Sequence, residues 1–387
     1  MNDEITAARK KRVQRIRRRR TAWFLAALTV VAVAVLLANT LTATTFRDIR
    51  DFAATVFAPF DGYPVVLDGA GAVDEKQMSM AYAVLSEETV TIYSQRGSLL
   101  AAFAHSFITP ELTAAGNRAV LYNVGGKELV VYNRTSELAR LSTEFNIVDA
   151  AVCRSGTLAV LTRSDKYTAQ LNVYNNGKYE SAMTWQSNAG FPLLVRLQPD
   201  GSTAAVACVT ANDGRPETVL TVIDTRDAAV RFTAHVDGIA ADIIVGSGVT
   251  VVTDEKAVLF SGGGEEKATY AYGDAPLLYV AHDEGAGLAL AFGDNSRPQI
   301  NSVVLLSSGL DVKAQAEAVG AVRDIYLTRS AVYVLGAGRV TEYNMSGEAR
   351  AAYSADAQAF ALIKTGSLLT LCADRIEKAE HIQEEAS

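Results

Sequence analysis

Charged side chains recur inside apolar segments that have the alternation of strands, and these are the residues best placed to do chemistry. Asp149, Asp242 and the Arg323–Asp324 pair lie in IVDAAV, AADIIV and VRDIY, and Arg196 lies in LVRLQ. Paired carboxylates can supply a general acid and a general base, and arginines can bind acidic groups or sugars. The same aspartates can instead bond backbone and turn groups. We expect the structural role and keep catalysis as the alternative.

Other chemistry finds little support in the residue pattern. No two histidines or cysteines have the close spacing of metal ligands, the histidines being His105, His235, His282 and His381. The cysteines lie among apolar residues, as small buried hydrophobes do, and are Cys153, Cys208 and Cys372. The Gly-rich SGGGEE at 261–266 is expected to be a hairpin turn, because a phosphate-binding loop would precede a helix. We therefore expect no metal, no cofactor and no catalytic residue.

The N-terminal forty residues suggest a membrane anchor. Residues 1–20 hold nine Lys or Arg, and residues 21–41 carry no charge over a length that spans a bilayer. Under the positive-inside rule the tail would be cytoplasmic and everything after the span would lie outside a bacterial cytoplasmic membrane. A cleaved signal peptide is the rival interpretation, and binding of nucleic acid by the tail is not expected. Residues 42–61 are expected to form a spacer, partly helical.

The rest of the chain is a repeat of short strands. One element recurs seven times, as TVTIYS, ELVVYN, QLNVYN, VLTVID, KAVLFS, SVVLLS and RVTEYN. Successive copies are about 42 residues apart, which is the length of a four-stranded propeller blade. The sequence therefore predicts an all-β fold, a single β-propeller over residues 62–382.

The two ends of the repeat predict how the ring closes. GYPVVLDG at 62–69 is a strand without a preceding hairpin, and the C-terminal DAQAFALIKTG, SLLTLCAD and RIEKAE supply three strands without a fourth. Pairing them completes an eighth blade and hides the open edges. Seven blades remain the alternative, because VDEKQMSM is a weak first strand for the first blade.

Three connections between the second and third strands of a blade are long and polar. They are RSDKYTAQ at 163–170, TANDGRPETV at 210–219 and GDNSRPQINS at 293–302. All three would lie on one rim of the propeller, where they would offer Lys166, Tyr167, Arg215 and Arg297. Loops on a rigid scaffold commonly carry binding functions, although tolerated insertion is the simpler explanation.

The chain resembles the membrane-anchored WD40-like or quinoprotein-like β-propellers of Gram-positive bacteria, a domain-of-unknown-function family. The basic tail, the span, GYPVVLDG and YAVLSEETVTIYSQRG carry the resemblance, together with GNRAVLYNVGGKELVVYN and GTLAVLTRSDKYTAQLNVYNNG. The resemblance implies fold and location but no catalytic residues, and a quinone enzyme is not expected because the body has one tryptophan, Trp185. We expect a non-enzymatic scaffold that binds an envelope protein or cell-wall polymer. The alternative is a hydrolase or lyase acting on wall glycan through the inner-strand acids.

Overall fold

The computed structural model describes residue 29 and residues 43–67, 71–293 and 300–383. The chain divides into two compact units, residues 1–50 and 51–387. Of the first unit, the description covers Thr29 and the first half of helix α2 (Ala43–Val56). This helix lies inside the segment for which a partly helical spacer was expected.

The predicted location in a bacterial cytoplasmic membrane, with a single span, is corrected by the structure. Within residue 29, 43–67, 71–293 and 300–383, no helix is long and apolar enough to cross a membrane. The tail 1–20 and the segment 21–41, which was predicted to span and contact a bilayer, lie outside these ranges apart from Thr29. The prediction rested on the lack of charge over 21 residues. This is a property of the composition and does not by itself show that a segment folds as a membrane-spanning helix.

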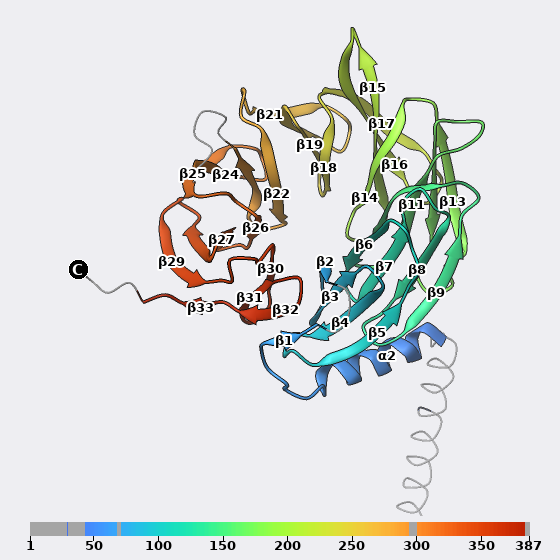
Figure 1. The fold of residues 1–387 in the computed structure, drawn as a ribbon. Helices are drawn as coiled ribbons and strands as arrows, with labels where there is room; N and C mark the ends of the chain where they lie inside the picture. The colour runs from blue at the N-terminus through green and yellow to red at the C-terminus, as the bar shows by residue number, and fades with distance from the viewer. Residues whose placement is uncertain (1–28, 30–42, 68–70, 294–299, 384–387) are drawn as a thin grey trace, which may run out of the picture. The chain divides into compact units, whose positions relative to one another are not determined.

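The second unit contains a β-propeller whose blades each have four strands, here called a to d from the central channel outward, and one of its sheets has a fifth strand (Figure 1). Blade 1 contains β2 (Ala72–Met78), β3 (Ala81–Ser86), β4 (Thr89–Ser94) and β5 (Leu99–Ala104). Blade 2 contains β6 (Pro110–Ala115), β7 (Arg118–Asn123), β8 (Glu128–Tyr132) and β9 (Glu137–Ser142). Blade 3 contains β10 (Ile147–Val152), β11 (Leu158–Thr162), β12 (Ala169–Tyr174) and β13 (Ser181–Ser187). Blade 4 contains β14 (Phe191–Leu197), β15 (Thr203–Asn212), β16 (Arg215–Asp224) and β17 (Val230–Asp237).

The second half of the ring continues in the same order. Blade 5 contains β18 (Ala240–Val245), β19 (Val249–Thr253), β20 (Lys256–Phe260) and β21 (Glu266–Ala271). Blade 6 contains β22 (Leu277–Asp283), β23 (Gly287–Phe292), β24 (Ile300–Leu306) and β25 (Val312–Val319). Blade 7 contains β26 (Asp324–Leu327), β27 (Ala331–Gly336), β28 (Arg339–Asn344) and β29 (Ala349–Ser354). Blade 8 contains β30 (Ala361–Lys364), β31 (Leu368–Leu371), β32 (Arg375–Lys378) and, from the start of the chain, β1 (Val65–Val66).

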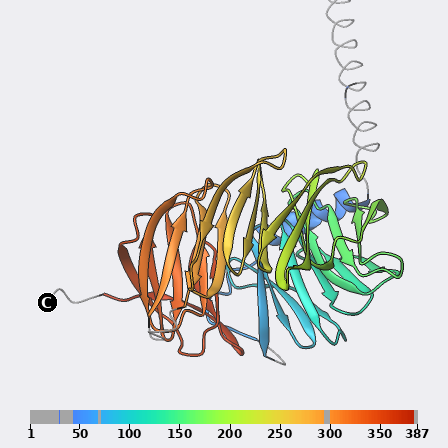
Figure 2. The same cartoon turned by 90° about the horizontal axis from the view of Figure 1, so that it is seen from above.

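The burial of each strand follows its place in the blade. Strand b is mainly apolar and mostly buried, as in β11, whose five residues are all buried. Strand d alternates between exposed and partly buried residues, as in β9 and β21, because only one of its faces packs on a neighbouring blade. The core is consequently a series of apolar clusters, most of them between adjacent blades, and the strands run between two faces of the ring (Figure 2).

Ring closure confirms the prediction of eight blades, with the first strand of the propeller and three strands from its C-terminal part in the last blade. Val65 and Val66 of β1 pair with Ile376 and Arg375 of β32. The structure also adds β33 (Glu380–His381), which was not predicted and pairs with the outer strand of blade 7. We call the face that carries the a–b and c–d turns the a–b face. The opposite one, with the b–c turns and the connections between blades, is the b–c face.

Candidate functional site

The innermost strands of alternate blades present an aspartate at one register position. Asp74, Asp149, Asp242 and Asp324 pair opposite Leu85, Leu161, Val252 and Leu335 of their strand b. In blades 1, 3 and 5 a register shift immediately precedes the aspartate. The sequence identified three members of this set and missed Asp74, because the polar strand around it has little apolar alternation.

Both carboxylate oxygens of Asp149 accept hydrogen bonds, most of them from neighbouring blades. Its Oδ1 accepts from the Tyr122 hydroxyl and from its neighbour Ala150 N, both at 2.9 Å. Its Oδ2 accepts from Val195 N at 2.8 Å and from Arg196 Nη1 at 2.9 Å. The carboxylate thus ties blade 3 to blades 2 and 4. Burial, and next the Asp149 charge, raise the pKa of Tyr122, which keeps this phenol a donor.

Arg196 joins Asp149 to a second carboxylate. Its Nε donates to Asp242 Oδ1 at 3.0 Å, so one guanidinium links the innermost strands of blades 3, 4 and 5. Burial acts to lower the pKa of Arg196, but Asp242 and Asp149 outweigh it and the pKa is raised. The structure therefore brings three predicted site residues into one charged network.

Arg323 and Asp324 belong to a separate set at the contact of blades 7 and 8. Arg323 Nη1 donates to the carbonyls of Ala357 and Ala359, the latter at 3.0 Å. Asp324 accepts from Ile325 N at 2.8 Å and from Leu362 N at 2.7 Å. Burial raises the pKa of Asp324 to about 6, in spite of these two bonds. Both side chains therefore form hydrogen bonds with backbone groups of neighbouring segments.

Glu75 is a partly buried acid that the sequence did not single out. Its Oε2 is out of contact with water and has no hydrogen-bond partner among the described residues. Burial raises the pKa of Glu75 to about 8, with Lys76 opposing and Asp324 and Asp74 adding to the shift. A carboxylic acid in this setting holds its proton near neutral pH. No other described acid combines burial and lack of a partner in this way.

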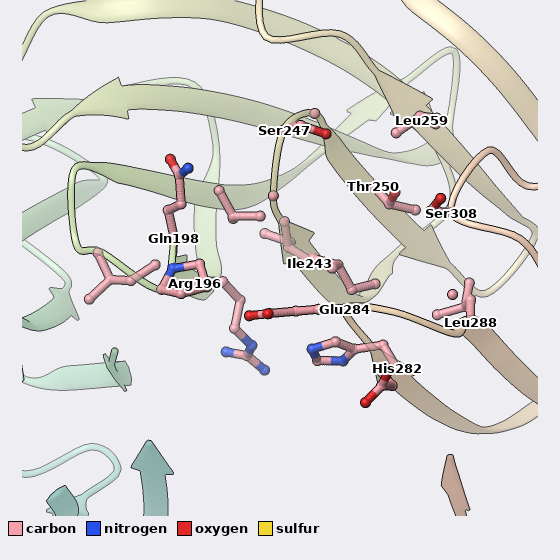
Figure 3. Close-up of a pocket in the computed structure, with 18 of the residues that line it drawn as sticks. Arg196, Gln198, Ile243, Ser247, Thr250, Leu259, His282, Glu284, Leu288 and Ser308 are labelled. Carbon is pink, nitrogen blue, oxygen red and sulfur yellow. The ribbon is translucent and has the colours of Figure 1, made fainter. Parts of the chain in front are cut away.

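A pocket of about 570 Å³ opens at the a–b face, where the channel meets blades 4, 5 and 6 (Figure 3). Its polar lining includes Arg154, Arg196, Gln198, Asp200, Ser247, Thr250, His282, Asp283, Glu284 and Ser308. The side chains of Arg196, His282 and Glu284 lie near one another on one side of the pocket, and Ser247 and Leu259 lie on another side (Figure 3). This pocket could not be predicted from the sequence, because its lining comes largely from the turns of several blades.

The predicted binding loops lie on the opposite, b–c face. Lys166 and Tyr167 are in the connection between β11 and β12, and Tyr167 borders a shallow hollow with Trp185 and Val230. Arg215 is in a strand rather than a loop, because β15 and β16 pair continuously up to a two-residue turn at Asp213–Gly214. Arg297 lies outside the described residues. The structure thus places Tyr167 and Arg215 on adjacent blades.

Exposed apolar side chains surround the channel mouth on the b–c face. Each lies in the connection that enters a blade or among the first residues of its strand a, the end that opens on this face. They are Val73, Ile108, Phe191, Ile239 and Leu278, with exposures of 52%, 93%, 68%, 43% and 43%. Exposed apolar side chains that gather on one part of a surface are a feature of interaction sites, and these five lie around one end of the channel.

The described residues contain no group of three or more His, Cys, Asp or Glu side chains that could hold a metal ion. The free cysteines Cys153, Cys208 and Cys372 are all buried. Burial raises the pKa of Cys208 to about 12, so this thiol is a poor nucleophile at neutral pH.

Comparison with known proteins agrees with the fold. The chain is similar to the crystal structure of the C-terminal WD40 domain of Sif2, with a TM-score of 0.62 and 13% sequence identity, over 84% of this chain and 100% of that one. It is also similar to the crystal structure of Saccharomyces cerevisiae Sqt1, with a TM-score of 0.58 and 10% identity, over 83% and 98% of the two chains. At this level of identity the likeness shows the fold alone, a WD40-like propeller.

The family resemblance is confirmed in part. No curated protein matches the chain by sequence. Neither the membrane anchoring nor the Gram-positive origin that the resemblance implied is supported by a comparison. Residues 68–381 match a family of unknown function, DUF5711, and the chain therefore belongs to this family.

Proposed function

We propose that the protein is a non-enzymatic scaffold that binds a protein partner on its b–c face. The observation that carries this proposal is the set of exposed apolar side chains around the channel mouth, which includes Ile108 and Phe191. Transfer of such side chains from water into an interface is favourable, at about 25 cal/mol per Å² of apolar surface. The WD40-like fold supports the same role by analogy.

The charges of the two faces indicate what kind of partner fits. Among described residues, the connections of the b–c face hold ten acidic and four basic residues, whereas those of the a–b face hold seven and six. The ten acids are Glu87, Glu88, Glu144, Asp165, Asp213, Asp254, Glu255, Asp274, Asp356 and Asp374. An acidic rim around an apolar centre suits a basic protein segment with an apolar anchor residue, and it disfavours nucleic acid.

The inner-strand acids argue for a scaffold and against glycan hydrolysis. Asp149 accepts four hydrogen bonds, and Asp324 accepts two from backbone N–H groups. A general base must have a lone pair free for the proton that it takes up. The expected partner, an envelope protein or cell-wall polymer, depended on the corrected membrane location. The proposal therefore identifies the partner by its basic and apolar chemistry.

Co-purification from the native cells tests the proposal. The double variant Ile108→Asp/Phe191→Asp places charges at the apolar mouth. The control Leu99→Asp/Val312→Asp changes two other exposed apolar residues, 59% and 55% exposed, on outer strands. We expect the first variant to lose at least about tenfold of the partner, since a buried charge costs more than 1.4 kcal/mol, and the control to keep it. Equal retention by both variants, or equal loss, contradicts the proposal.

A further inference from the structure

The pocket at the a–b face has the size and walls of a small-molecule site. Its volume of about 570 Å³ lies within the usual range for such sites, roughly 300–1,000 Å³. The inner part runs between blades 5 and 6, where Ile244, Leu259, Leu288 and Leu310 supply apolar walls. These walls fit a short aliphatic chain.

Thr250 marks a polar contact that the protein leaves unmade. Its side chain lines the pocket and is only 9% exposed, yet no described residue makes a hydrogen bond with its hydroxyl (Figure 3). The hydroxyl oxygen is accessible from the pocket, so a bound molecule can form a hydrogen bond with it.

The charges in and around the pocket favour a cation. The lining and the side chains that form ion pairs with it hold five carboxylates and three arginines. The carboxylates are Asp149, Asp200, Asp242, Asp283 and Glu284, and the arginines are Arg154, Arg196 and Arg329. Arg196 is already held between two of these carboxylates. A ligand that enters the pocket consequently meets an excess of negative charge.

One ion pair crosses the mouth of the pocket and is weak enough for a ligand to break it. Arg154 Nη2 of blade 3 lies 3.3 Å from Glu284 Oε1 of blade 6, and the two side chains are 68% and 57% exposed. Exposed pairs contribute little to stability. A ligand ammonium can therefore replace Arg154 as the partner of Glu284 without a large loss elsewhere.

We propose that this pocket binds a small amphipathic amine, with its ammonium group at Glu284 and its aliphatic chain between blades 5 and 6. The site lies on the face opposite to the proposed partner surface and is independent of it. The ammonium enters beside His282 and Asp283 and displaces Arg154 from its carboxylate. The chain passes Thr250 and lies against Leu259 and Leu288.

Methyl NMR of the full chain, titrated with hexylamine at pH 7 and low salt, tests the proposal. We expect saturable shifts of the Leu259 and Leu288 methyl groups, with Kd on the order of 1 mM for a ligand of this size. Hexanoate and hexanol, the anionic and neutral probes of equal length, are expected to leave these methyl groups unshifted. Shifts of the same size with hexanoate, or no saturable shift with hexylamine, overturn the proposal.

Three variants distinguish binding of hexylamine at this site from nonspecific contact with the protein. Glu284→Gln is expected to weaken hexylamine binding at least about fivefold, because it removes the carboxylate. Arg154→Gln is expected to tighten binding, since the competing cation is gone. Glu265→Gln, an exposed acid that pairs with Lys267 away from the pocket, is the control and is expected to have no effect. Weaker binding by Arg154→Gln, or an equal effect of the control, contradicts the site.

Discussion

Val65 pairs with Ile376, so a strand from the start of the chain completes the blade that the end of the chain begins. The side chain of Ile376 is fully buried, whereas that of Val66 beside it is 70% exposed. The seam between β1 and β32 is therefore short, and Ile376 is its most deeply buried side chain.

Truncation of Ile376 should loosen the closure. We expect Ile376→Ala to lower the free energy of unfolding by about 2–5 kcal/mol, because it leaves a cavity in a fully buried site. The control Val66→Ala, in the same blade, should change it by less than about 0.5 kcal/mol. Denaturant unfolding of both variants measures the difference, and similar losses would show that side-chain packing does not hold the seam.

Asp149 should be the most sensitive charged residue of the channel. Asp149→Asn leaves Arg196 with one carboxylate and weakens four hydrogen bonds, so we expect a loss of about 2–4 kcal/mol in the free energy of unfolding. The control Asp242→Asn removes a single contact, to Arg196, and should cost less. Adding Arg196→Met to Asp149→Asn should recover part of the loss, and a strictly additive double variant would contradict the coupling.

The seam between blades 1, 7 and 8 should make stability fall as pH rises. The folded-state pKa is about 8 for Glu75 and about 6 for Asp324, both above their usual values. Between the unfolded and folded pKa values the native state binds more protons, so the free energy of unfolding decreases with pH. The limiting slope is about 1.4 kcal/mol per pH unit for each group.

Glu75→Gln isolates this effect. We expect the variant to be more stable than the parent protein at pH 8 and to lose most of the fall in melting temperature between pH 5 and pH 8. The exposed Glu88, substituted by Gln, is the control and should keep the fall. A parent protein whose melting temperature rises steadily over this range would refute a protonated Glu75.

The repeated strands made the architecture predictable, whereas several site residues were missed because they lie where the sequence departs from the repeat pattern. The strands and the pairing of GYPVVLDG with the C-terminal strands follow from local alternation and from the need to cover open edges. Glu75 and Asp74 were missed because their strand, AVDEKQM, has mainly polar residues. The segment around Arg215 was expected to be a loop. Where both faces of a hairpin are exposed to solvent its residues are polar, and this composition is also typical of a loop.

The buried ion pair between Asp51 and Arg134 could not be predicted from the sequence either, because 83 residues separate the two side chains. Asp51 Oδ2 accepts from Arg134 Nη2 at 2.7 Å and from Nε at 2.9 Å, and Oδ1 accepts from the Thr135 hydroxyl at 3.1 Å. Both charged side chains are buried. The pair fixes the end of helix α2 to blade 2.

Asp51→Ala should therefore release the helix end. It leaves Arg134 buried without its carboxylate, and we expect faster amide hydrogen exchange in residues 51–60 or a loss of about 3–5 kcal/mol in stability. The control Arg140→Ala removes an exposed pair with Glu137 and should change neither quantity. Unchanged exchange together with unchanged stability in Asp51→Ala would show that this pair does not anchor the helix.

Photo-crosslinking from the b–c face is the most direct test of the scaffold. Ile108 is replaced by a photoreactive phenylalanine analogue, and the outer-strand residue Val312 is replaced in the same way as a control, in the cells that make the protein. The account predicts one discrete crosslinked protein from position 108, attached through a segment rich in Lys or Arg, and none from position 312. Equal crosslinking from both positions, or attachment through an acidic segment, would contradict it.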